Sequence, residues 1–171
     1  MERQLNATAA SLLGFLHERP MTGYELIQTA ELVIGDFWSL TRSQVYRELS
    51  AMAADGLIEA GETGARATRP YALTGTGREA FASWLATEPP TETIRFPLLL
   101  AVVFGRHLPE EQLAAFVASH RPRHERKLAE YRALVESDVG QDTYARATLD
   151  FGLRYEQAVL DWFDALPFKQ P

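Results

Sequence analysis

Apolar residues recur at steps of three and four along most of the chain, and this pattern predicts a mainly α-helical protein. In the first half it predicts three helices, a short hairpin and a fourth helix. The first helix is marked by Leu5, Leu12 and Leu16. It ends at Arg19-Pro20, because a residue that precedes proline disfavours helical backbone.

Two capping boxes mark the starts of the second and third helices. Thr22-Gly23-Tyr24-Glu25 opens a helix that we expect to run to about Leu32. Thr41-Arg42-Ser43-Gln44 opens one that we expect to run through Ala54. Asp55-Gly56 ends the third helix, since glycine readily adopts the left-handed conformation at a helix C-terminus.

A hairpin and a fourth helix follow. Leu57-Ile58 and Tyr71-Ala72-Leu73 are predicted as its two strands. Thr76-Gly77-Arg78-Glu79 is predicted to open the fourth helix. We expect that helix to bury four side chains, namely Ala80, Phe81, Trp84 and Leu85.

The second half is predicted to be entirely helical. The run Phe96–Phe104 is apolar around most of a helix, so we expect it to be buried. Pro109 is expected at the first position of the next helix, which Pro122 must kink or break because proline lacks an N–H. The last helix carries an apolar stripe from Tyr144 to Leu166, which forms either a dimer seam or a contact within the domain.

One segment lacks an apolar pattern. Residues 89–94, beginning with Pro89-Pro90, are rich in proline and threonine, so we expect a linker there. It divides the chain into an N-terminal domain over residues 1–88 and a helical domain over residues 95–171.

The third predicted helix has an apolar side and a polar side. Val45, Leu49 and Met52 face the core, and the polar side is densest near the N-terminus. A recognition helix has this arrangement, because its first turn enters the major groove. There Arg pairs with guanine, Gln pairs with adenine, and hydroxyl groups bind phosphate. The alternative is a solvated helix face that carries only a capping box.

The hairpin adds two arginines. Arg66 and Arg69 lie in its loop and second strand, close to Glu62. In a winged helix-turn-helix this hairpin lies along the DNA backbone or the minor groove, where exposed arginine is favoured. The alternative is a polar hairpin that makes no contact with DNA.

The first half also carries a series of short motifs. They are Leu12-Leu13-Gly14, Met21-Thr22-Gly23-Tyr24-Glu25-Leu26, Phe37-Trp38, Gln44-Val45-Tyr46, Leu49, Gly56-Leu57-Ile58, Tyr71-Ala72-Leu73-Thr74 and Gly77-Arg78. In this order and spacing they resemble the PadR family of bacterial transcriptional regulators. The resemblance implies a winged helix-turn-helix domain followed by an all-helical dimerisation domain. It also implies a repressor that is relieved by a small molecule.

Carried across residue by residue, the resemblance implies that Tyr24 contacts phosphate at the second helix. It implies that Ser43, Gln44 and Tyr46 contact DNA on the third helix. Two features depart from the family pattern. Many members have proline where this chain has Arg47, which adds a candidate contact, and many have a more basic wing. The second half matches only in length and helical pattern, so the effector-binding residues stay unknown.

Composition excludes several classes of protein. The 171 residues include no cysteine, so disulfides, cysteine-ligated zinc and a thiol nucleophile are excluded. The longest apolar run is about half a membrane span, and the N-terminus lacks the apolar core of a signal peptide. We therefore expect a cytoplasmic protein without a membrane partner. The net charge of −6 argues against a general nucleic-acid coat protein, but it allows a DNA reader with local arginines.

Three other functions or roles compete with this interpretation. His120, His124 and Glu125 suggest a metal-dependent enzyme, but Pro122 disrupts the register of the two histidines. We therefore expect no enzyme, metal or cofactor. Phe37-Trp38 is expected to anchor the core, with a ligand contact as the alternative. A winged-helix protein-interaction module without DNA binding is the main alternative to a DNA reader.

The sequence thus predicts a homodimeric winged-helix repressor that reads a pseudo-palindromic double-stranded operator. A small aromatic or hydrophobic molecule is the candidate effector. Two recognition helices about one DNA turn apart read enough bases for specificity, which is the physical reason for a dimer. The residues expected at the DNA are Thr22, Tyr24, Thr41, Arg42, Ser43, Gln44, Tyr46, Arg47, Arg66 and Arg69. The residues expected at the dimer interface are Phe116, Leu128, Tyr144, Phe151, Tyr155 and Trp162.

Overall fold

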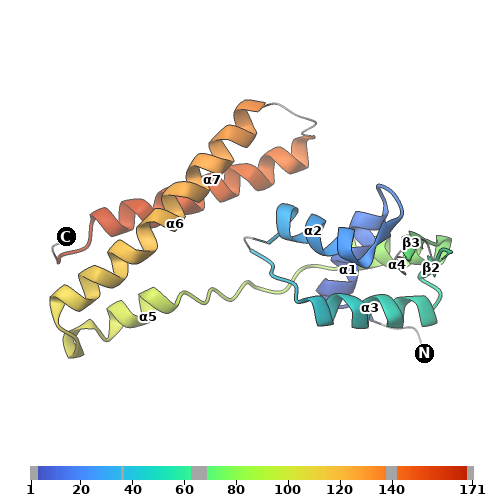
Figure 1. Cartoon of the computed structure of the whole chain (residues 1–171), viewed down its shortest axis with the longest axis horizontal. Helices are drawn as coiled ribbons and strands as arrows, with labels where there is room; N and C mark the ends of the chain where they lie inside the picture. Colours follow the sequence, from blue (N-terminus) through green and yellow to red (C-terminus); the bar gives the residue numbers. More distant parts are fainter. Residues whose placement is uncertain (1–3, 36, 63–68, 138–141, 169–171) are drawn as a thin grey trace. The chain divides into compact units, whose positions relative to one another are not determined.

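The computed structural model describes residues 4–35, 37–62, 69–137 and 142–168. The chain divides into two compact units, Met1–Thr91 and Glu92–Pro171, and each is described by itself (Figure 1). Residues 88–96 carry no regular secondary structure. Among the described residues, no helix combines the length and the apolar character that a membrane span requires.

The first unit combines four helices with a small sheet in its described residues. In chain order the elements are α1 (Ala7–Leu16), β1 (Met21–Thr22), α2 (Gly23–Val33), α3 (Arg42–Ala54), β2 (Ile58–Ala60), β3 (Pro70–Leu73) and α4 (Gly75–Leu85). These elements make a helix-turn-helix, formed by α2 and α3, and a hairpin wing, formed by β2 and β3.

The sheet has three antiparallel strands in the order β1-β3-β2. Met21 pairs with Tyr71 in one ladder, and Ile58 pairs with Leu73 in the other. The sequence predicted β2 and β3 but not β1, because a strand of two residues is too short to show an alternating pattern. This extra strand joins the chain that precedes α2 to the hairpin.

The core of the first unit lies between α1, α2, α3 and the start of the hairpin. Its largest fully buried side chains are Leu12, Leu13, Leu26, Val45, Leu49, Met52 and Ile58. The buried face of α3 is the one that the apolar pattern predicted. Each such side chain contributes about 2 kcal/mol when buried. Tertiary packing therefore holds these short helices, which would be marginal in isolation.

Three apolar residues expected in this core are exposed instead. Phe37 is 56% exposed, and Trp38 and Leu85 are also exposed. The Phe37 and Trp38 backbone N–H groups both donate to the Ile34 carbonyl, at 3.1 and 2.7 Å. This tight turn after α2 carries both rings outward, so the predicted core anchor is wrong. Leu85 is the last residue of α4 and lies beyond the packed part of that helix.

The predicted helix ends are mostly confirmed. Both capping boxes are present, and Gly56 has a φ of 71° at the end of α3. The predicted start of α4 at Thr76 is wrong by one residue. Thr74 is the N-cap, and its hydroxyl oxygen accepts a 3.0 Å bond from the Gly77 N–H. Gly75 and Gly77 follow Thr74, and glycine is a poor helix former, so the sequence pattern did not mark Thr74 as the start of the helix.

Among the described residues of the second unit, all regular secondary structure is helical. They are α5 (Pro97–Val103), the short 3-10 helix η2 (Gly105–His107), α6 (Glu110–Ser137) and α7 (Thr143–Asp164). The long helices α6 and α7 pack against each other, as Figure 1 shows. The buried core residues of this unit are Leu98, Val117, Leu128, Val159, Leu160 and Phe163.

α6 continues through Pro122, so of the two predicted outcomes, a kink or a break, the break does not occur. The missing N–H and the ring of an internal proline cost about 3 kcal/mol. Val117 and Leu128 are buried on either side of the proline, and α6 packs along α7. This packing offsets the local cost and keeps the helix intact. Pro109 stands immediately before α6, which begins at Glu110.

α5 is exposed over most of its surface, although its sequence predicted a buried helix. Leu98 is buried, whereas Leu99, Leu100, Val103 and the following Phe104 are exposed. The helix has seven residues and packs on α6, so one face is covered. The exposed face forms an apolar patch on the second unit.

Candidate nucleic-acid interface

α3 presents a polar face to solvent. Val45, Leu49 and Met52 are fully buried on its other side. The exposed residues of the polar face and its flanks are Arg42, Ser43, Tyr46, Arg47 and Ser50. The helix is thus held by its apolar face while two cations and three hydroxyl groups are left accessible. This arrangement can contact base edges and phosphates together.

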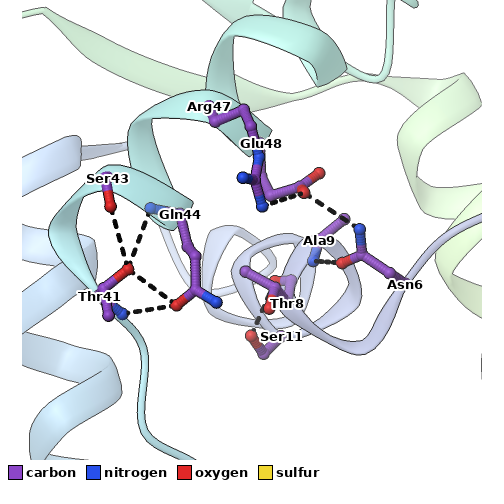
Figure 2. Close-up of polar contacts among 9 residues, drawn as sticks. All are labelled: Asn6, Thr8, Ala9, Ser11, Thr41, Ser43, Gln44, Arg47 and Glu48. Atoms are coloured by element: carbon purple, nitrogen blue, oxygen red, sulfur yellow. Dashed lines mark hydrogen bonds and ion pairs between the residues drawn. The ribbon is translucent and has the colours of Figure 1, made fainter.

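The first turn of α3 is organised by Thr41, as Figure 2 shows. The Thr41 hydroxyl oxygen accepts from the Gln44 N–H at 3.3 Å, and the Thr41 N–H donates to Gln44 Oε1 at 2.9 Å. The Thr41 hydroxyl also lies 3.2 Å from that of Ser43. Gln44 Oε1 is therefore occupied by the cap. A bidentate contact between Gln44 and adenine would require this cap to open.

Tyr46 connects α3 to the start of α2. Its ring lies so close to Gly23 that a Cβ atom added there would stand 2.6 Å from Tyr46 Cε1. Gly23 therefore allows the ring to pack over the first turn of α2. Tyr24, on the same turn, is exposed, and its hydroxyl oxygen accepts a 2.9 Å bond from Gln28. The Tyr46 ring thus lies at the N-terminus of α2, where the helix dipole favours phosphate, and the Tyr24 hydroxyl is held beside Gln28 on the following turn.

Thr22 caps α2 through a reciprocal set of bonds. The Thr22 N–H donates to Glu25 Oε2 at 2.8 Å, and the Glu25 N–H donates to the Thr22 hydroxyl oxygen at 3.2 Å. Arg19 pairs with the other carboxylate oxygen at 2.9 Å. The backbone and hydroxyl bonds from Thr22, and then the bond from Arg19, lower the pKa of Glu25 below its usual range.

The wing contributes one described arginine. Arg69 is exposed, and its Nε donates to the Gly61 carbonyl across the hairpin at 3.1 Å. This bond holds the guanidinium at the edge of the wing, where Glu62 is also exposed. Arg66, the other predicted wing contact, lies outside the described residues.

Sequence reasoning missed two residues behind α3. Glu48 is a carboxylate on the buried face, only 4% exposed, and Asn6 Nδ2 donates to its Oε1 at 3.0 Å. Asn6 is also the N-cap of α1. A signal was present, because Glu48 lies next to Met52 on the helical wheel, at the edge of the apolar face. An acid on an apolar face requires a partner, and the partner lies far away in the sequence.

The residues predicted for a dimer interface are distributed unevenly over the second unit. Tyr144 is 82% exposed, and Phe151 and Tyr155 are exposed with their rings stacked at 6.3 Å. Phe116 is 37% exposed, and Trp162 is partly buried against the core of the second unit. Leu128 is a correction: it is 6% exposed and belongs to the core between α6 and α7. Little of its side chain is therefore left to contact a partner.

The two histidines that suggest a metal site in the sequence, His120 and His124, do not converge in the structure. His124 is buried, and its Nδ1 lies 2.5 Å from Glu156 Oε2 on α7. His120 is exposed on α6. No cluster of metal-ligating side chains occurs among the described residues. The His124–Glu156 pair instead joins the two long helices.

Comparison with known protein families matches both halves of the chain. Residues 12–83 match the transcriptional regulator PadR-like family. Residues 94–166 match the family described as virulence activator alpha C-term. The first match covers α2, α3 and the wing, and the second covers α5, α6 and α7.

Two curated relatives match over most of their lengths. The negative transcriptional regulator PadR of Bacillus subtilis is 23% identical, with 91% of this chain and 93% of the relative covered. A probable transcriptional regulator of Mycobacterium tuberculosis is 28% identical, with coverages of 90% and 92%.

Solved structures share the fold. A PadR-like regulator from Bacillus cereus is 21% identical with a TM-score of 0.83, covering 92% of this chain and 94% of its own. Bacillus subtilis PadR in complex with operator DNA is 21% identical with a TM-score of 0.79, with coverages of 94% and 96%. The same regulator in complex with p-coumaric acid is 21% identical with a TM-score of 0.71, with coverages of 94% and 95%.

Proposed function

This chain belongs to the PadR-like family of transcriptional regulators, and from that premise we propose that it is a repressor that binds operator DNA as a homodimer. The family consists of transcriptional regulators rather than enzymes. The observation that carries the proposal is the exposed polar face of α3, with Arg42, Ser43 and Arg47 accessible on a helix whose other face is buried. The proposed site of action is the cytoplasm.

The chemistry of this face divides between base edges and phosphates. Arg47 lies one turn after Gln44, and its guanidinium has the planar fork that matches guanine in the major groove. The hydroxyl groups of Thr22, Tyr24 and Tyr46 supply phosphate contacts that set the register of the helix. Arg69 of the wing adds a further phosphate contact.

A dimer is proposed through the second unit. Tyr144, Phe151 and Tyr155 are spaced by seven and four residues on α7, so they lie on one face, and all three are exposed. The exposed face of α5 offers more apolar surface. Such patches on a small protein are typical of an interface between protein chains.

A small aromatic or hydrophobic effector is proposed as the ligand that relieves repression. The support is a relative, since Bacillus subtilis PadR has been solved with p-coumaric acid. An effector changes DNA affinity only by its differential affinity for the DNA-bound and free arrangements of the dimer. The residues that hold it are not assigned.

The test begins with duplexes that the wild-type chain selects from a random-sequence pool. Affinities are then measured for one selected duplex and for a shuffled duplex of equal length. Arg47→Ala should reduce the discrimination between them by about 1–3 kcal/mol. Arg69→Ala should weaken both duplexes alike and make the salt slope shallower by about one. Arg154→Ala, in the second unit, is the control and should change neither.

The competing function is a protein-interaction module without DNA binding. The net charge of −6 and the exposed Phe37 and Trp38 favour it. It requires that no duplex be enriched and that binding show no steep dependence on salt. Either result with folded wild-type protein would replace the proposed function.

A further inference from the structure

Glu48 is a buried carboxylate on the helix that we propose reads DNA. At 4% exposure it is one of the few buried charged residues among those described. Burying a carboxylate is costly unless charges and hydrogen bonds compensate. A glutamate at this position repels phosphate, so its charge bears on DNA binding as well as on the contact that it makes with α1.

Two contacts of Glu48 Oε1 place its charge, as Figure 2 shows. Asn6 Nδ2 donates to this oxygen at 3.0 Å. Asn6 is itself held by its Oδ1, which accepts a 2.9 Å bond from the Ala9 N–H at the start of α1. The carboxylate is therefore anchored on α1, and it does not move freely with the surface of α3.

The same oxygen lies 3.8 Å from Arg47 Nη2. The Arg47 side chain is 71% exposed, so solvent reaches it while the carboxylate beneath it stays fixed. A long arginine side chain loses rotamer freedom when it is held by a fixed partner. The pair also cancels part of the charge that a phosphate would otherwise attract.

From this geometry we propose that Glu48 is a specificity-determining positioning residue. It holds the Arg47 guanidinium against α3 and weakens binding to DNA of any sequence more than binding to the operator. Nonspecific affinity depends on the net positive charge that faces the phosphates. Neutralisation of Arg47 by Glu48 therefore lowers nonspecific affinity by its full amount. In specific binding the guanidinium forms directional bonds with a base, and prior orientation by Glu48 lowers the ordering cost. The inference rests on the proposed DNA-binding function.

The decisive variant is Glu48→Gln, which removes the charge and keeps an oxygen that can accept the bond from Asn6. At 0.1 M salt we expect shuffled DNA to bind more tightly, by up to about eightfold for one additional effective charge. The salt slope should steepen by up to about 0.9. The affinity for the selected duplex should increase less than the affinity for shuffled DNA, so the ratio of the two affinities falls. Glu79→Gln is the matched control, because it removes an exposed acid from α4 of the same unit.

A double-mutant cycle tests whether Glu48 acts through Arg47. In the Arg47→Ala background, Glu48→Gln should have no more effect on shuffled DNA than Glu79→Gln has. If the gain persists there, or if Glu79→Gln reproduces it in the wild-type background, Glu48 acts as a general charge and the inference is wrong.

Arg47→Ala alone provides a test that leaves the buried residue in place. Because Glu48 already neutralises Arg47, this variant should change the salt slope on shuffled DNA by much less than 0.9, the value for a full phosphate contact. A full change overturns the inference even if Glu48→Gln fails to fold. Failure of the wild-type chain to select any duplex instead refutes the proposed function, so the two failures are distinguishable.

Discussion

At the scale of single residues, Glu25 combines a helix cap with a charge effect. Its carboxylate accepts bonds from the Thr22 N–H and hydroxyl and pairs with Arg19, and these contacts lower its pKa. A carboxyl group whose pKa is lower in the folded state stabilises the fold above its unfolded pKa. That stabilisation is lost as the pH falls through the folded pKa.

We therefore expect Glu25→Gln to be less stable than wild type at pH 7, by about 0.5 kcal/mol after allowance for solvent screening. The difference should shrink towards pH 3, because the amide keeps the cap while the wild-type carboxyl becomes protonated. Urea unfolding at both pH values measures it. An equal difference at the two pH values would show that the charge of Glu25 is not the cause.

At the scale of secondary-structure elements, the junction between the wing and α4 depends on one glycine. The Leu57 carbonyl at the base of the hairpin accepts bonds from the Thr74 N–H and hydroxyl, at 3.2 and 2.9 Å. A Cβ atom at Gly77 would stand 2.1 Å from this same carbonyl oxygen. The obstacle is backbone, so relief requires the hairpin or α4 to shift.

Gly77→Ala should therefore destabilise the protein by about 1–3 kcal/mol. Gly75→Ala is the matched control, because no atom lies within 4 Å of the Cβ that it would add. It should be neutral or stabilising by up to about 1 kcal/mol, since alanine favours helix. Thermal unfolding of the two variants compares them directly. Equal losses in both would contradict the close packing of α4 on the hairpin.

At the scale of the whole molecule, the proposed dimer determines whether two copies of α3 can bind together. The exposed aromatic face of α7, formed by Tyr144, Phe151 and Tyr155, is the surface that we expect to be covered. A charge placed in a buried apolar contact is costly unless it is paired.

The double variant Phe151→Asp/Tyr155→Asp should consequently sediment as a monomer and bind a selected duplex at least tenfold more weakly, because one recognition helix contacts half of the site. Ala145→Asp adds an acid to an exposed position on another side of α7 and should remain dimeric. A double variant that stays dimeric with unchanged affinity would place the seam elsewhere, with the exposed face of α5 as the next candidate.

The local elements were accessible from sequence because their causes are local. Capping boxes at Thr22 and Thr41 and the left-handed Gly56 depend on residues a few positions apart. The polar face of α3 could likewise be predicted, because its apolar residues recur at helical spacing. β1 was missed because its pairing with β3 joins segments about fifty residues apart, which no local pattern records.

The candidate site was only partly accessible in this way. The exposed residues of α3 could be named from its amphipathic pattern. The Asn6–Glu48–Arg47 contacts could not, since they need the packing of α1 against α3. The engagement of Gln44 Oε1 by Thr41 was accessible from sequence, because it is part of the predicted capping box.

The sequence by itself determined the capped starts of α2 and α3, the end of α3 and the apolar face of α3, because capping bonds and side-chain period are local properties. Tertiary structure decided which apolar faces are covered. It buried Leu128 between α6 and α7, left the face of α5 exposed, and carried Phe37 and Trp38 outward. It also kept α6 continuous across Pro122. In each case the outcome depends on which distant side chains contact an element, and burial against such neighbours outweighs local preference.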